Sequence, residues 1–143
     1  MIDVKEGCRL TKDQYRELLD GLRKNLPGKA SELQSYWSMG DLLHEIGQPR
    51  YGSSLFHKLA SAVGVDAVTL YDSRRFRAIW PEEDAPGELE KKGVLWTQMR
   101  CILHSKLNED ERRELVKYVQ KDKPTVKELK ARVRAMTSTI LGS

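Results

Sequence analysis

The chain has 143 residues, of which 39% are hydrophobic and 32% charged, and its 25 Lys and Arg against 21 Asp and Glu give a net charge of +4. This length fits about one domain with a sizeable core, which needs neither a metal nor disulfides to fold. We expect no membrane span and no signal peptide, because no stretch approaches about 18 apolar residues and the N-terminus lacks an apolar core.

The first two predicted helices each begin with a capping box. Thr11 stands three residues before Gln14. Ser31 stands three residues before Gln34 in the same way. Apolar or small residues spaced three or four apart follow each box, namely Tyr15, Leu18, Leu19, Leu22 and Leu26 after the first and Leu33, Tyr36, Trp37, Gly40 and Leu43 after the second. Pro and Gly residues then end each helix.

Two further helices are expected on either side of Gly64. The shorter one begins at Ser53 or Ser54 and runs to residue 63. The longer one covers about 66–80, where Pro81 stops it.

The C-terminal part begins with an acidic stretch and continues with basic helices. Residues 81–90 hold five acids and no base, together with two Pro and one Gly, which predicts a linker. Helices are expected over 94–104, after a cap at Asn108 and after a cap at Thr125. Residues 91–143 hold 13 bases and 6 acids, which suits either nucleic-acid contact or a solvated helix face.

These elements predict an all-α fold of about seven helices, with no strand and no internal repeat. The expected organisation is an N-terminal helix with a linker at 1–30, a helical region at 31–80, an acidic linker at 81–93, and a basic three-helix segment at 94–143 that joins 31–80 in one domain.

Residues 53–80 have the spacing of a helix-turn-helix. Ala60 is the small residue expected where the two helices cross, and Gly64 follows four residues later as a turn residue tolerant of positive φ. Val65 and Leu70 supply the apolar positions that follow the turn. The segment therefore predicts a DNA-binding motif whose second helix covers about 66–80.

The candidate DNA contacts lie on both helices of this motif. Arg side chains contact guanine edges and phosphates, and hydroxyl groups contact phosphates or bases. The candidates are His57, Lys58, Thr69, Tyr71, Ser73, Arg74, Arg75 and Arg77. Val68, Leu70 and Ile79 are expected to face the core. In the alternative reading, the Arg residues only pair with the acidic stretch that follows.

Among the candidates, we expect Thr69 and Ser73 to point into the major groove, with Arg74 and Arg77 flanking them toward the phosphates. Ser73 departs from the motif, because this position is often apolar. Either of two apolar residues is expected to fill that space instead, Phe76 or Val68.

Five sequence stretches in order resemble the N-terminal domain of YhcG-type nucleases: YWSMGDLLHEI, RYGSSLFHKLASAVGV, LYDSRRFRAIWP, LWTQMRCIL and PTVKELKARV. The last two are also similar to the DNA-binding domain of ParB and KorB partition proteins. The resemblance covers about residues 35–134. It implies an all-helical, helix-turn-helix DNA-binding domain whose later helices support or extend the footprint.

The chain matches neither the PD-(D/E)xK nuclease domain of YhcG-type proteins nor the nucleotide-binding domain of ParB-type proteins, so we expect no enzymatic activity. Cys8 and Cys101 form no CxxC motif, and the three His form no HExxH motif, so we expect a reduced cytoplasmic protein with no metal and no cofactor.

The sequence thus predicts a non-enzymatic, sequence-specific double-stranded DNA-binding protein, associated with the nucleoid. It would act as a repressor, a partition protein or a recombination accessory factor of a mobile element or plasmid. The alternative is a helical scaffold for a separately encoded nuclease or another partner protein, and a third reading is a single-strand or RNA binder. A homodimer is expected, formed through the helix at 11–26 or through the C-terminal helix.

Overall fold

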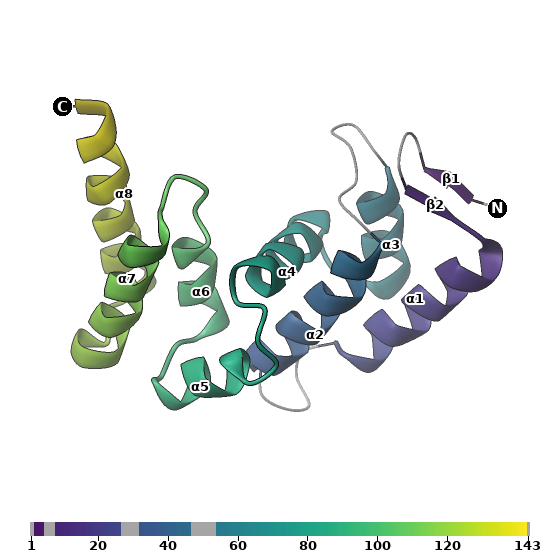
Figure 1. Cartoon of the computed structure of the whole chain (residues 1–143), viewed down its shortest axis with the longest axis horizontal. Helices are drawn as coiled ribbons and strands as arrows, with labels where there is room; N and C mark the ends of the chain where they lie inside the picture. Colours follow the sequence, from purple (N-terminus) through teal and green to yellow (C-terminus); the bar gives the residue numbers. More distant parts are fainter. Residues whose placement is uncertain (1, 5–7, 27–31, 47–53, 143) are drawn as a thin grey trace. The chain divides into compact units, whose positions relative to one another are not determined.

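A computed structural model describes residues 2–4, 8–26, 32–46 and 54–142 (Figure 1). The chain divides into two compact units, Met1–Pro81 and Glu82–Ser143. The first holds strands β1 (Ile2–Val4) and β2 (Cys8–Leu10) and helices α1 (Lys12–Lys24), α2 (Glu32–Glu45), α3 (Leu55–Val63) and α4 (Ala67–Ile79). The second holds α5 (Ala85–Lys91), α6 (Trp96–Ile102), α7 (Glu109–Asp122) and α8 (Val126–Gly142).

The eight helices of the described residues confirm the all-α class. The expectation of no strand is wrong at the N-terminus, where β1 and β2 form an antiparallel pair with Ile2 opposite Leu10. Each strand has only three residues, which is too short for an alternating pattern to stand out in the sequence. Whether 94–143 forms one domain with 31–80 stays a prediction.

Capping boxes begin three helices as the sequence predicts. The backbone N–H of Thr11 donates to Gln14 Oε1 at 2.8 Å, and that of Gln14 donates to Thr11 Oγ1 at 3.0 Å. The same reciprocal pairs begin α7 and α8, formed by Asn108 with Glu111 and by Thr125 with Glu128. The box expected at Ser31 lies outside the described residues.

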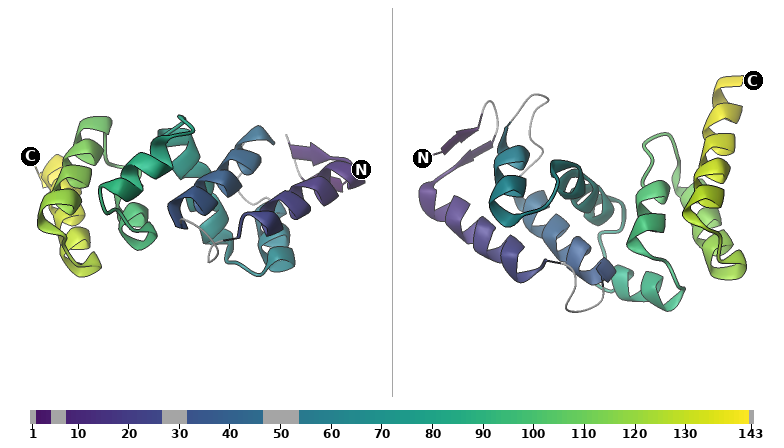
Figure 2. Two further views of the ribbon diagram at one scale, coloured as in Figure 1. Left: turned by 90° about the horizontal axis from the view of Figure 1, so that it is seen from below. Right: turned by 180° about the vertical axis from the view of Figure 1, so that it is seen from behind.

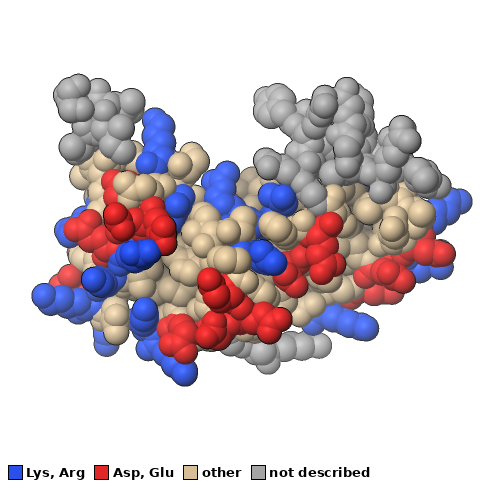
Figure 3. All heavy atoms as spheres, viewed as in Figure 1, with Lys and Arg blue, Asp and Glu red and all other residues tan. Residues whose placement is uncertain are grey.

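The acidic stretch predicted to be a linker instead contains helix α5. Pro86 stands in the first turn of the helix, where its missing N–H costs no hydrogen bond. Ala85, Pro86 and Leu89 are buried, so one face of the helix contributes to a core. Its acidic side chains, which gather over α5 in Figure 3, remain exposed for the most part.

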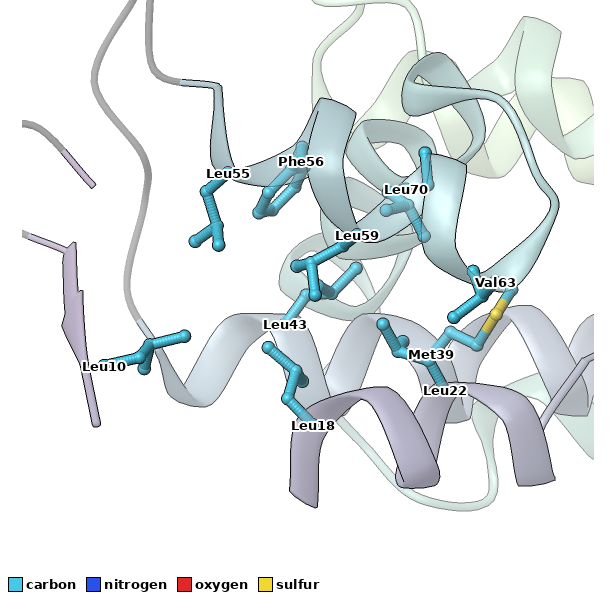
Figure 4. Close-up of a cluster of buried hydrophobic side chains, with 11 residues drawn as sticks. Leu10, Leu18, Leu22, Met39, Leu43, Leu55, Phe56, Leu59, Val63 and Leu70 are labelled. Carbon is cyan, nitrogen blue, oxygen red and sulfur yellow. The ribbon is translucent and has the colours of Figure 1, made fainter. Parts of the chain in front are cut away.

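The core of the first unit draws on β2 and on all four of its helices (Figure 4). Leu22, Leu43, Leu55 and Leu59 are fully buried there. The other members of the cluster are Leu10, Leu18, Met39, Phe56, Ala60, Val63 and Leu70. Burying such side chains contributes about 1.5–3 kcal/mol each. The pair α3–α4 is therefore stabilised by α1 and α2 beneath it.

Helices α2 and α4 pass very close to each other at Gly40. A Cβ atom at this position would lie 2.0 Å from the carbonyl oxygen of Ser73. Around this point, Trp37 Nε1 donates to the carbonyl oxygen of Trp80 at 2.7 Å, and Arg77 Nε donates to Asp41 Oδ1 at 2.9 Å. The lack of a side chain at Gly40 thus lets the two helices pack backbone to backbone.

In the second unit, α6 and α7 pack against α8 (Figure 2). Arg112 donates to the carbonyl oxygens of Ile102 and His104 at 3.1 and 3.0 Å. These hydrogen bonds satisfy carbonyl groups that would otherwise lack partners at the end of α6. Across the described residues of the chain, no helix combines the length and the apolar character that crossing a membrane requires.

We expect Gly40→Ala to destabilise the first unit by about 3 kcal/mol or more, because its Cβ meets rigid backbone that can move only if α2 and α4 separate. Thermal unfolding followed by circular dichroism measures this. Gly21→Ala on α1 is the matched control, since its Cβ meets only the movable tip of Leu42. If Gly40→Ala and Gly21→Ala unfold at the same temperature, the inferred close contact between α2 and α4 is wrong.

Candidate nucleic-acid interface

A short turn centred on Gly64 joins α3 to α4. Gly64 has φ +83° and ψ +31°, which confirms the expected left-handed conformation. Its N–H donates to the carbonyl oxygen of Ala60 at 2.8 Å, and the N–H of Val65 donates to the same oxygen at 3.0 Å. Asp66 precedes α4, but its side chain makes no capping hydrogen bond. The chain thus changes direction at a position whose positive φ favours glycine.

The side of α4 that faces α2 differs from the sequence prediction. Ser73, expected to point into a DNA groove, is fully buried, because it lies where the backbone of α2 at Gly40 passes. Phe76, one of the two residues expected to fill the space at this position, is also fully buried. Arg77, expected to reach phosphates, instead pairs with Asp41 and lies over the Trp37 ring at 5.9 Å from its centroid.

The opposite side of α4 faces solvent. Val68, Tyr71, Arg75 and Ala78 are exposed and recur every three or four residues, which is one helix face. Val68 was expected in the core, but 57% of its surface is exposed, because the buried Leu70 and Ser73 set the rotation of the helix. Ile79, also expected in the core, is only half-buried.

The remaining candidates lie near this exposed face or on α3. Thr69 and Arg74 are half-buried on α4, while His57 and Lys58 are exposed on α3. The rings of Phe56 and Tyr71 are in contact, with their centroids 4.6 Å apart. Tyr71 thereby joins the middle of α4 to the start of α3, where His57 and Lys58 follow Phe56.

Sequence reasoning missed Val68 as a surface residue and Ser73 as a core residue. The signal that identifies Ser73 is Gly40, which lies in the apolar stripe of α2 and marks a close helix crossing. A crossing at a glycine needs a small residue on the other helix, and Ser73 is the small residue near the middle of α4.

The exposed face of α4 carries mixed charge. Asp66 is exposed before the helix and Asp72 is half-buried within it, beside Arg75. Among the described residues, no group of His, Cys, Asp and Glu is arranged to hold a metal ion. The face presents cationic, hydroxyl and aromatic groups to solvent.

In comparisons with known proteins, the chain matches no family model, no curated protein and no solved structure. The resemblance to YhcG-type and ParB-type domains stays a prediction from the residues themselves.

The turn can be tested by two substitutions at Gly64. We expect Gly64→Val to cost a few kcal/mol, because a β-branched residue is strained at φ +83°. Gly64→Asn is the matched variant and should cost less, since Asn tolerates this conformation and a Cβ there meets nothing within 4 Å. Urea unfolding measures both, and equal stability of the two variants would contradict the strain.

Ser73→Ala tests the burial of this side chain. Ser73 Oγ is buried without a hydrogen-bond partner among the described residues. Removing an unsatisfied hydroxyl should change stability by less than about 1 kcal/mol in either direction. We expect DNA affinity to stay unchanged as well, measured by fluorescence anisotropy. If DNA affinity falls while the melting temperature does not change, the prediction is contradicted and Ser73 belongs to the DNA contacts.

Proposed function

We propose that the chain is a non-enzymatic, sequence-specific double-stranded DNA-binding protein that acts through a helix-turn-helix formed by α3 and α4. One observation carries the proposal. The left-handed turn at Gly64 joins two helices of nine and 13 residues, and α4 presents Tyr71 and Arg75 to solvent while its other side is anchored on α2. A helix that is anchored on one side and presents a Tyr and an Arg on the other suits entry into the major groove.

The contacts we propose differ between the helices. Tyr71 and Arg75, with the half-buried Thr69, occupy the side of α4 that can approach bases and phosphates. His57 and Lys58 lie exposed on α3, where contact with the phosphate backbone is expected. Arg77 acts through Asp41 as a residue that positions α4.

We further propose that two copies bind together, because one such helix reads only a few base pairs. This binding would serve repression, partition or recombination.

A second function is favoured by one observation. Val68 is 57% exposed and Tyr71 38% exposed on the same face of α4. Apolar side chains gathered on an outward helix face also suit a protein partner, as in a scaffold for a separately encoded nuclease. The two functions differ in their response to salt, since phosphate contacts weaken steeply as salt rises.

The proposal is tested by Tyr71→Ala with Arg75→Ala in one variant. Loss of one phosphate-contacting Arg should lower the slope of log affinity against log salt by about one unit. Anisotropy titrations on labelled duplexes at several salt concentrations measure this. Arg16→Ala, which removes one exposed cation from α1, is the charge-matched control and should bind like the parent.

Arg77→Ala gives the contrast that a positioning residue predicts. It leaves the half-buried Asp41 without its partner and should lower stability by about 1 kcal/mol with the salt slope unchanged. If the Tyr71, Arg75 variant binds duplex as tightly as the parent with the same slope, the DNA surface is not on α4 and the scaffold function takes precedence.

A further inference from the structure

A groove of about 610 Å³ runs between α6 and α8 in the second unit. Both helices contribute residues at every third or fourth position, so each helix gives one continuous face. The lining residues are Thr97, Arg100, Cys101 and His104 from α6 and its end, and Val126, Lys130, Val133, Arg134 and Thr137 from α8. This volume falls in the range of about 300–1,000 Å³ that is usual for ligand sites.

The lining is cationic and contains no carboxylate. Arg100, Lys130 and Arg134 are exposed along its edges, with His104 at one end of α6. For Lys130 and Arg134, the described residues provide no salt-bridge partner within 4 Å. A groove edged by hydrogen-bond donors of one charge sign recognises an anionic ligand.

The residues of the groove floor bear on whether the ligand is a protein helix or another anion. Val126 and Val133 supply the apolar part of the floor, where Val133 is buried and Val126 is half-buried. The exposed large hydrophobic residues of the described chain all lie outside the lining. A partner helix usually inserts large apolar side chains into its groove. Three exposed cations, Arg100, Lys130 and Arg134, belong to the lining of this groove and favour an anionic ligand instead.

Two of the cations, Lys130 and Arg134, lie in a row along α8. Lys130 and Arg134 are one helical turn apart on α8, which corresponds to about 6 Å along the helix. The lining positions from Val126 to Thr137 extend over three turns, or about 16 Å. A linear ligand with regularly repeated negative charges matches this arrangement, and a nucleic-acid strand has such a backbone.

We propose that the α6–α8 groove binds the sugar–phosphate backbone of a nucleic-acid strand, with Arg100, Lys130 and Arg134 contacting phosphates. The inference rests on the nucleic-acid function proposed above and adds a second, sequence-independent contact surface to it. Backbone contacts of this kind raise affinity for all sequences alike.

Cys101 provides a reporter inside the groove. It is half-buried, and its Sγ donates to the carbonyl oxygen of Thr97 at 3.5 Å. Burial raises the pKa of the thiol, and the positive charges of Lys130 and Arg100 oppose that rise. A bound phosphate would both cover the thiol and neutralise these charges. Nucleic acid in the groove should therefore slow alkylation, which proceeds through the thiolate.

The experiment uses the full chain with Cys8→Ser, so that Cys101 is the single thiol. Iodoacetamide alkylation is followed by mass spectrometry without ligand, with a 20-base-pair duplex of mixed sequence, and with one strand of that duplex. We expect the rate at Cys101 to fall about fivefold or more with at least one of the two polynucleotides. If a mobility shift on the same samples shows that DNA is bound while the alkylation rate at Cys101 does not change, the proposal is overturned.

Two double variants test which residues hold the strand. Lys130→Ala with Arg134→Ala should abolish the protection, expressed as the ratio of rates with and without DNA, and lower the salt slope by about two units. Lys117→Ala with Lys121→Ala removes the same charge from exposed positions on α7 outside the groove and should keep the protection. Equal behaviour of the two variants contradicts the assignment.

Three further arms separate this inference from its alternatives. Protection by a free nucleoside diphosphate as strong as that by the polynucleotide would make the groove a small-molecule site and overturn the strand assignment. Equal protection by polyglutamate would assign it to an acidic protein. The Tyr71, Arg75 variant, tested at saturating DNA, should retain protection at Cys101, so that failure of the α4 surface and failure of the groove are observed separately.

Discussion

The close passage of α2 and α4 at Gly40 is the contact on which the rest of the first unit depends. The carbonyl oxygen of Ser73 occupies the space that a side chain at Gly40 would take. Because the backbones are this near, the rotation of α4 must place a small side chain toward Gly40. That rotation puts Ser73 and Arg77 toward α2 and leaves Tyr71 and Arg75 on the outer side. The character of the candidate interface is thus decided by a glycine on another helix.

The polar contacts around this crossing also fix how the two helices are oriented. Trp37 donates its ring N–H to the carbonyl at the end of α4, and Arg77 links to Asp41 on α2 while its guanidinium lies over the ring of Trp37. Interior apolar contacts alone are non-directional and would permit small changes in helix register. Directional hydrogen bonds at its carboxyl end and the Gly64 turn at its amino end position α4, which the proposed DNA-binding function requires.

Two different candidate binding surfaces follow from the arrangement. The outer face of α4 mixes Arg75 with acids and apolar side chains, which suits selective contact. The α6–α8 groove has cations and no carboxylate in its lining, which suits contact with any polyanion. The net charge of +4 is small because the five acids within residues 81–90 offset part of the positive charge of residues 91–143.

The sequence by itself determined the features that depend on neighbours within a few residues. The capping boxes at Thr11, Asn108 and Thr125 and the left-handed turn at Gly64 are local interactions, so the helices that they bound could be predicted. Only the tertiary structure decided which way each helix faces. Ser73 is polar yet buried and Val68 is apolar yet exposed, because the proximity of Gly40, 33 residues away in the chain, outweighs side-chain polarity. Likewise, Lys130 and Arg100 share a groove through helix packing that no periodicity along one helix reveals.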